Sequence, residues 1–294
     1  MATLVTAVPF RDNWYFDEVF AGIADRAAAA GVSAEVLAAL PGARGRDEVT
    51  AWFDAALGGD DCIGAVAVGF EFRQPQVERL LARGKPVVAI GGVDRHLPSV
   101  SPDDAAVARA ATEHLLGLGH RAITHLAGYA MSPDDFSMRA DRVRGYSDAM
   151  RAAGLETQSH VVPCDFTAEA AYRAATRILS EADRPTAVFA VADELAFPVL
   201  DAARDLGLSV PRDISVIGID DRPESAARGL TTWRQDPVAV GAAAAERAMG
   251  LADFDHHEVD LRLVLRTSTA PPGRGGAPRR RGLPFFRRGA RGTA

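Results

Sequence analysis

Short apolar runs alternate with amphipathic helical patterns along almost the whole chain, and this alternation restricts the possible folds more than any other feature of the sequence. The strand-like runs lie at residues 4–8, 33–37, 63–68, 86–90, 122–127, 161–163, 187–191, 214–219, 230–233 and 261–266. The helical patterns lie at residues 15–30, 47–57, 74–83, 103–118, 139–153, 168–180, 194–206 and 238–250. Such alternation predicts an α/β fold with parallel sheets covered by helices on both faces. Because these strands are many for one doubly wound sheet, we expect two sheets.

The size and composition of the chain agree with two globular lobes. The chain has 294 residues, of which 48% are hydrophobic and 24% are charged, as is ordinary for a globular protein. No apolar run approaches the roughly 18 residues that span a bilayer. The apolar run at residues 3–9 is short and lacks the basic leader of a signal peptide. We therefore expect a cytoplasmic protein that makes no contact with a membrane.

The cysteines and histidines do not form a metal-binding pattern. Cys62 and Cys164 are the only cysteines, lie far apart, and each stands beside a predicted strand, so they predict buried, reduced thiols. His114, His120 and His125 span a helix, a turn and a strand with no carboxylate in register. The sequence also lacks the GxGxxG, P-loop, GxSxG and HExxH motifs of common enzymes. We expect no metal, no cofactor and no enzymatic activity.

Positive charge is concentrated at the C-terminus. Residues 271–294 carry seven arginines and no acid, so the net charge of −6 leaves −13 on residues 1–270. An acidic body is a poor surface for duplex DNA. The Gly-, Pro- and Arg-rich segment 271–294 predicts a disordered tail, which is solvated or contacts nucleic acid or acidic lipid.

An apolar strand at residues 214–219 ends in two adjacent carboxylates, Asp220 and Asp221. Ligands of open α/β sheets bind just beyond the carboxyl ends of the strands. Asp220 is therefore the first candidate for a ligand contact. The alternative is that the two aspartates only cap the following turn.

A series of short motifs runs in one order along residues 3–270. The motifs are VP at 8–9, NWYF at 13–16, GI at 22–23, GKPVV at 84–88, EHLLGLGHR at 113–121, RVRGY at 142–146, DELA at 193–196, VPRDISVIGIDD at 210–221, LTT at 230–232 and RTST at 266–269. Each motif alone is weak, but their order and spacing together are specific. Together they resemble the effector-binding core of the lactose-repressor (LacI/GalR-type) transcription factors.

The resemblance implies a periplasmic-binding-protein-like fold of two doubly wound parallel-sheet lobes joined by three crossovers. The N-terminal lobe would hold residues 1–101 plus 235–259, and the C-terminal lobe residues 104–232 plus 260–270. A small polar effector, a sugar or sugar derivative, would bind in the cleft between the lobes without being transformed. The alternative function is that of a solute-binding protein of a sugar transporter.

The resemblance also implies which side chains contact the effector, and for most of them a structural role is the alternative. Tyr15 and Phe16 open the first helix, where an aromatic ring could stack on a sugar or pack against the helix start. Arg142 offers a planar fork for hydroxyl groups or a carboxylate, or is a surface arginine.

Four further positions lie near predicted strand ends or a crossover. Asp193 would cap the helix that begins at Glu194 and accept a hydrogen bond from the ligand. Phe189 would stack on the effector or belong to the core, and Trp233 with Gln235 would line the cleft or pack the hinge. With Asp220, the predicted ligand-binding residues are Tyr15, Phe16, Arg142, Phe189, Asp193, Asp220 and Trp233.

The chain departs from the family pattern at its start, because its first strand begins at residue 3, where the family has a DNA-reading helix-turn-helix before that strand. Operator DNA would be bound only through such a segment, so the chain as given is not expected to read a DNA sequence. Ala192 replaces a usual asparagine and Trp14 a common proline. A homodimer is expected, with Ala55, Leu80 and Leu81 as apolar surface or core.

Overall fold

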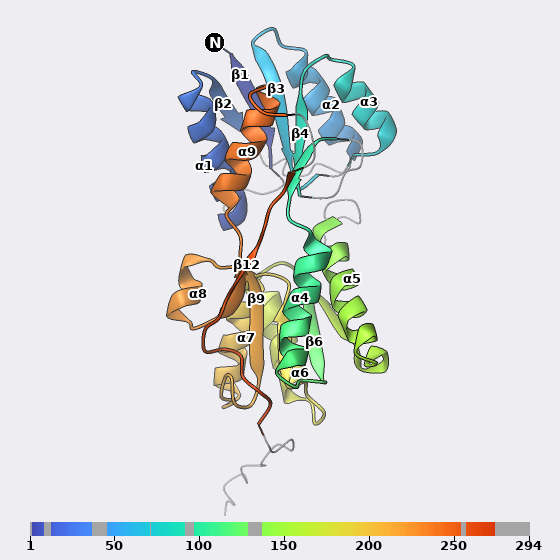
Figure 1. Cartoon of the computed structure of the whole chain (residues 1–294), viewed down its shortest axis with the longest axis vertical. Helices are drawn as coiled ribbons and strands as arrows, with labels where there is room; N and C mark the ends of the chain where they lie inside the picture. The colour runs from blue at the N-terminus through green and yellow to red at the C-terminus, as the bar shows by residue number, and fades with distance from the viewer. Residues whose placement is uncertain are drawn as a thin grey trace, which may run out of the picture.

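Two six-stranded sheets, each covered by helices, lie end to end in the computed structural model (Figure 1). The structure describes residues 2–8, 13–36, 46–70, 72–91, 97–128, 137–253 and 257–273. In these residues all strand pairs are parallel except the antiparallel pair of β10 with β12.

The first sheet has the order β11-β5-β4-β3-β1-β2. Its strands are β1 (Thr3–Ala7), β2 (Ser33–Val36), β3 (Cys62–Val68), β4 (Val87–Ile90), β5 (Ser99–Ser101) and β11 (His257–Glu258). Helices α1 (Trp14–Ala29) and α9 (Pro237–Ala248) pack on one face, and α2 (Arg46–Leu57) and α3 (Gln74–Leu81) on the other. Alternate residues of β1, β3 and β4 face these two helix pairs, so both faces are apolar.

The second sheet has the equivalent order β12-β10-β9-β8-β6-β7. Its strands are β6 (Ile123–Gly128), β7 (His160–Cys164), β8 (Ala187–Ala190), β9 (Ser215–Asp220), β10 (Thr231–Arg234) and β12 (Arg262–Val264). Helices α4 (Asp104–Gly117) and α5 (Ser137–Ala152) cover one face, and α6 (Ala168–Ser180) and α7 (Asp193–Asp205) the other. A short helix α8 (Pro223–Ala227) follows β9, and a 3₁₀ turn, η1 (Glu156–Gln158), precedes β7.

The chain passes between the two sheets three times (Figure 1): from β5 to α4, from β10 to α9, and from β11 to β12. The predicted fold, two parallel-sheet lobes with three crossovers, is confirmed. In both sheets the strand order reverses beside the first strand, between β1 and β3 and between β6 and β8. These reversals are the points at which α/β sheets place ligands. The lobe boundaries given above stay a prediction.

Helices α1 and α9 touch backbone to backbone although about 220 residues separate them, as the ion pair of Arg26 with Glu246 shows. A Cβ atom on Gly22 would lie 2.0 Å from the Val238 carbonyl oxygen, and one on Gly241 would lie 2.0 Å from the Val19 carbonyl oxygen. Glycine at both positions therefore allows the third segment of the chain to complete the first lobe.

Most predicted elements lie within two residues of the observed ones, but the short elements β5, η1, α8 and β11 were not predicted. Cys62 and Cys164 are buried free thiols, as predicted. No helix among the described residues is long and apolar enough to cross a bilayer. Residues 274–294 of the predicted tail lie outside the described residues.

The three residues named for the dimer surface divide between the two alternatives, core and surface. Leu80 is fully buried in the core between α2, α3 and the sheet, where it cannot contact a partner. Leu81 and Ala55 are exposed. The homodimer itself stays a prediction.

Candidate functional site

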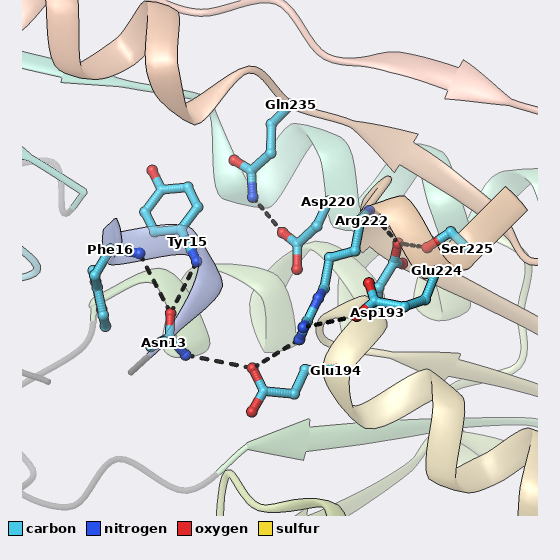
Figure 2. Close-up of polar contacts among 10 residues, drawn as sticks. All are labelled: Asn13, Tyr15, Phe16, Asp193, Glu194, Asp220, Arg222, Glu224, Ser225 and Gln235. Atoms are coloured by element: carbon cyan, nitrogen blue, oxygen red, sulfur yellow. Dashed lines mark hydrogen bonds and ion pairs between the residues drawn. The ribbon is translucent and has the colours of Figure 1, made fainter. Parts of the chain in front are cut away.

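The N-termini of α1 and α7 meet between the two lobes (Figure 2). The Asn13 side chain caps α1, because its oxygen accepts hydrogen bonds from the backbone N–H groups of Tyr15 at 3.1 Å and Phe16 at 3.4 Å. Its nitrogen donates across the lobes to the Glu194 carboxylate at 3.4 Å. Because α1 follows β1 and α7 follows β8, the carboxyl ends of the two sheets face each other at this point. We call the polar residues gathered here the inter-lobe site.

Asp220 is the last residue of β9 and has an unusual backbone. Its φ angle is 134° and that of Asp221 is 58°, both in a region that side chains other than glycine rarely adopt. Asp221 is held there by ion pairs with Arg234 and Arg266, each at 2.6 Å. Residues in such conformations cost about 1–3 kcal/mol each and gather at functional sites. The strained turn fixes the direction of the Asp220 carboxylate.

The Asp220 carboxylate is 7% exposed and accepts a hydrogen bond from the Gln235 side chain (Figure 2). Burial, and then the negative charge of Asp193, raise the pKa of Asp220 from 3.8 to about 7, while Arg142, Gln235 and Arg222 act in the opposite direction. No cationic side chain of the described residues forms an ion pair with it. Asp220 is therefore a buried acceptor with no ion-pair partner among the described residues, although the charges of Arg142 and Arg222 act on it.

Arg142, on α5, pairs with Asp104, the first residue of α4, at 2.7 Å, and both side chains are almost fully buried. The guanidinium also donates to the Val191 carbonyl oxygen. Burial raises the pKa of Asp104 and the charge of Arg142 opposes that rise. The sequence did not point to Asp104, because a second aspartate at a helix start carries no signal of a partner 38 residues away.

Tyr15 lies beside these charges and Phe16 does not. Burial, together with the negative charges of Asp104 and Asp220, raises the pKa of the Tyr15 hydroxyl, and the nearby Arg142 lowers it. Figure 2 shows Tyr15, at the start of α1, and Asp220, at the end of β9, in the same region between the lobes. Phe16 is 7% exposed and packs in the core between α1, α9 and the first sheet. Tyr15 therefore lies at the inter-lobe site and Phe16 belongs to a core cluster, and a ligand contact by either residue stays a prediction.

Asp193 does not cap α7, which corrects the sequence prediction. The N-cap residue is Ala192, which has no capping side chain, and Asp193 is the first residue of the helix. The Asp193 carboxylate accepts hydrogen bonds from the hydroxyl of Ser225 at 2.6 Å, the hydroxyl of Thr232 at 2.7 Å and the backbone N–H of Arg222 at 3.2 Å. Both oxygens are used, and the side chain is fully buried.

Asp193 thereby ties α7 to the turn after β9. Its carboxylate packs so closely over β9 that a Cβ atom on Gly218 would lie 2.2 Å from it. Burial is the main cause that raises the pKa of Asp193 to about 6. Its three donors indicate a role in positioning the Asp220 turn.

Phe189 and Trp233 belong to the core between the second sheet and α4. Phe189 is fully buried and stacks on the His125 ring at 4.4 Å between centroids. Burial lowers the pKa of His125 to about 4, so the ring is neutral near pH 7. Trp233 is partly buried, and its indole N–H is buried with no partner among the described residues. The structure therefore gives Phe189 the core role that the sequence left open.

Arg222 joins the lobes and was missed by the sequence. Its guanidinium lies 5.7 Å from the centre of the Trp14 ring and 5.8 Å from that of Phe197. It also pairs with Glu194 at 3.4 Å. Because Trp14 and Arg222 are distant in sequence and belong to different lobes, no local pattern could have found this contact.

The inter-lobe site thus brings together four of the seven predicted ligand-binding residues, Tyr15, Arg142, Asp193 and Asp220. No group of three or more metal-ligating side chains was found in the part of the chain that the structure describes. A surface groove lies elsewhere, at the C-terminal half of α7. It is lined by Leu200, Asp201, Arg204, Leu208, Val210, Arg228, Thr267 and Ser268.

Two lobes with this topology and a polar site between them define a periplasmic-binding-protein-like domain. A family model described as a periplasmic binding protein-like domain matches residues 112–269. The chain is 32% identical over 254 residues to the HTH-type transcriptional regulator MalR of Streptomyces coelicolor, a match that covers 81% of this chain and 72% of that protein. The chain belongs to the LacI/GalR family of transcriptional regulators, whose effector-binding core it resembles throughout.

Solved structures agree with this assignment. A LacI transcriptional regulator from a Rhodococcus species superposes with a TM-score of 0.75 at 27% identity, covering 92% of this chain and 98% of that one. The complex of the transcriptional regulator CelR with cellobiose superposes with a TM-score of 0.73 at 25% identity, covering 90% and 84%. These relatives are named as regulators, which does not favour the alternative of a transporter's solute-binding protein.

Proposed function

We propose that the chain senses a small polar metabolite, a sugar or sugar derivative, which binds at the inter-lobe site and is not transformed there. The observation that carries the proposal is Asp220, a buried acceptor that two consecutive strained residues direct to the meeting point of the lobes. Proteins keep such strain where function requires it. The cellobiose complex of CelR, a structure of similar fold, supports a sugar as the ligand class.

In this proposal each residue of the site has a distinct role. Asp220 accepts a hydrogen bond from the ligand, and Tyr15 presents its ring to an apolar face of the sugar. Arg142 is held by Asp104 and the Val191 carbonyl, so its guanidinium is fixed before the ligand arrives. Asp193 and Gln235 position Asp220 through the hydrogen bonds described above.

Because the site has residues from both lobes, a ligand there would favour the arrangement in which the lobes are together. A ligand shifts such an equilibrium by its difference in affinity for the two arrangements. In a longer protein with a helix-turn-helix and a dimer interface, this shift would change the affinity for operator DNA. The dimer, the DNA contact and the absence of catalysis are parts of the proposal.

The test is a thermal-shift screen of neutral sugars, amino sugars, polyols and nucleosides, followed by calorimetric titration of the compounds that stabilise the protein. Asp220→Ala and Arg142→Ala each remove charge-assisted hydrogen bonds, so each should weaken binding by about 1.5–3 kcal/mol, or roughly 10- to 150-fold. Asp201→Asn, at the groove on α7, is the matched control and should bind normally. Unchanged affinity in both site variants would show that the ligand binds elsewhere.

A further inference from the structure

The positive charges of the inter-lobe site are already neutralised by carboxylates of the same site. Arg142 is paired with Asp104 at 2.7 Å. Arg222 is paired with Glu194 at 3.4 Å, and with Glu224 at 3.5 Å on its other side. The described residues therefore offer a ligand no unpaired arginine at this site.

Two further carboxylates of the site, those of Asp193 and Asp220, differ in the number of protein donors from which they accept hydrogen bonds. Asp193 accepts three hydrogen bonds from protein donors, so its oxygens are satisfied without a ligand. Asp220 accepts only from Gln235 among the described residues, although it is 93% buried. Taking a carboxylate out of water without a counter-ion is strongly unfavourable, so such a group takes up either a proton or a cation.

The absence of an ion-pair partner for Asp220 among the described residues points to the chemistry of the effector. Building on the proposed function, we propose that the effector is a hydroxylated amine, such as an amino sugar, whose ammonium group pairs with the free side of Asp220. Tyr15 lies close enough to Asp220 for the carboxylate charge to raise the pKa of its hydroxyl, so in this proposal its ring contributes a cation–π contact to the same ammonium group. Hydroxyl groups of the ligand would meet the remaining polar groups of the site.

The same arrangement discriminates against anionic sugars. A phosphate or carboxylate would approach Asp220 without gaining an unpaired positive charge, because the charges of Arg142 and Arg222 are paired with Asp104 and Glu194, although Arg142 keeps N–H donors for ligand hydroxyls.

The experiment compares matched sugars by isothermal titration at pH 7. The probes are D-glucosamine, D-galactosamine and D-mannosamine, each with its neutral parent sugar, its N-acetyl derivative and the 6-phosphate of the parent. An ammonium–carboxylate hydrogen bond should make at least one amino sugar bind about tenfold or more tightly than its parent and its N-acetyl form. The sugar phosphates should bind more weakly than the parents.

The variant Asp220→Asn keeps the shape of the side chain and removes its charge, so it should reduce the preference for the amine to about twofold or less. Asp201→Asn should leave the preference intact. If a neutral sugar binds as tightly as its amino form, or if the preference survives in Asp220→Asn, the amine inference is wrong while the proposed function stands. If no sugar of any form binds, the proposed function fails together with the inference. Should Asp220→Asn not fold, the comparison of amino with N-acetyl sugars in the unchanged protein decides.

Discussion

The buried carboxyl group of Asp220 should make the protein less stable as the pH rises. A carboxylate in an ion pair has the opposite effect, because its stabilisation is lost as the pH falls. Burial and the charge of Asp193 raise the pKa of Asp220 from 3.8 to about 7 in the folded chain. The unfolded chain releases this proton near pH 4. The stability that Asp220 contributes in acid is therefore lost as the pH rises from about 4 through 7.

The size of the effect follows from the shift. Each unit of pKa corresponds to ~1.4 kcal/mol, and most of the shift lies above pH 5, so ~2 kcal/mol of unfolding free energy should be lost between pH 5 and pH 8. Asp220→Asn cannot ionise, its oxygen can still accept from Gln235, and asparagine tolerates a positive φ angle. The variant should therefore gain about 2 kcal/mol relative to the unchanged protein over this range.

The assay is urea denaturation of both proteins at pH 5, 6, 7 and 8, with the exposed Asp60→Asn as a control that should show a constant difference. The informative quantity is the difference in unfolding free energy between variant and unchanged protein at each pH. A difference that stays flat from pH 5 to pH 8 would refute the reasoning that Asp220 is buried without a counter-ion.

Three further predictions concern the packing around the site. Arg142→Met leaves Asp104 buried and unpaired, so urea denaturation should show a loss of about 3–5 kcal/mol; a loss under 1 kcal/mol would mean that the pair is solvated. Gly22→Ala places a Cβ atom against the Val238 carbonyl and should lower the melting temperature, with a cost of about 1–3 kcal/mol. Gly117→Ala is the control: no atom lies within 4 Å of its added Cβ, so it should leave the melting temperature unchanged. An equal drop in melting temperature in both variants would contradict the α1–α9 contact. Trp14→Ala removes the ring beside Arg222 that joins the lobes. It should increase the radius of gyration in small-angle scattering, whereas an unchanged curve would show that this contact does not hold the lobes together.

The sequence predicted the elements of the fold well because hydrophobic periodicity is a local property. The run at residues 214–219 is apolar except for Ser215, as expected for a strand buried on both faces, and it matches β9 within one residue. Asp220 could be predicted for the same reason: a carboxylate that directly follows a buried strand lies at the edge where ligands bind. The family resemblance predicted which segments of the chain form each lobe and that three crossovers join the lobes.

What the sequence missed are the contacts that depend on tertiary structure. Asp193 was predicted to cap a helix, but its partners Ser225 and Thr232 are 32 and 39 residues away. Two hydroxyls with short hydrogen bonds outcompete a local cap, and no local pattern shows that they come together. Arg222 and Asp104 were overlooked because charged residues are common at turns and helix starts, and only their burial distinguishes them.

The central claim is that a ligand lies between the two lobes at Asp220, and hydrogen–deuterium exchange with and without a bound sugar locates it most directly. The compound used is the one with the largest thermal shift in the screen. We expect the ligand to slow exchange at two places together, residues 14–18 at the start of α1 and residues 219–222 at the end of β9. Protection confined to one lobe, or to the groove around Asp201 and Arg228, would contradict it.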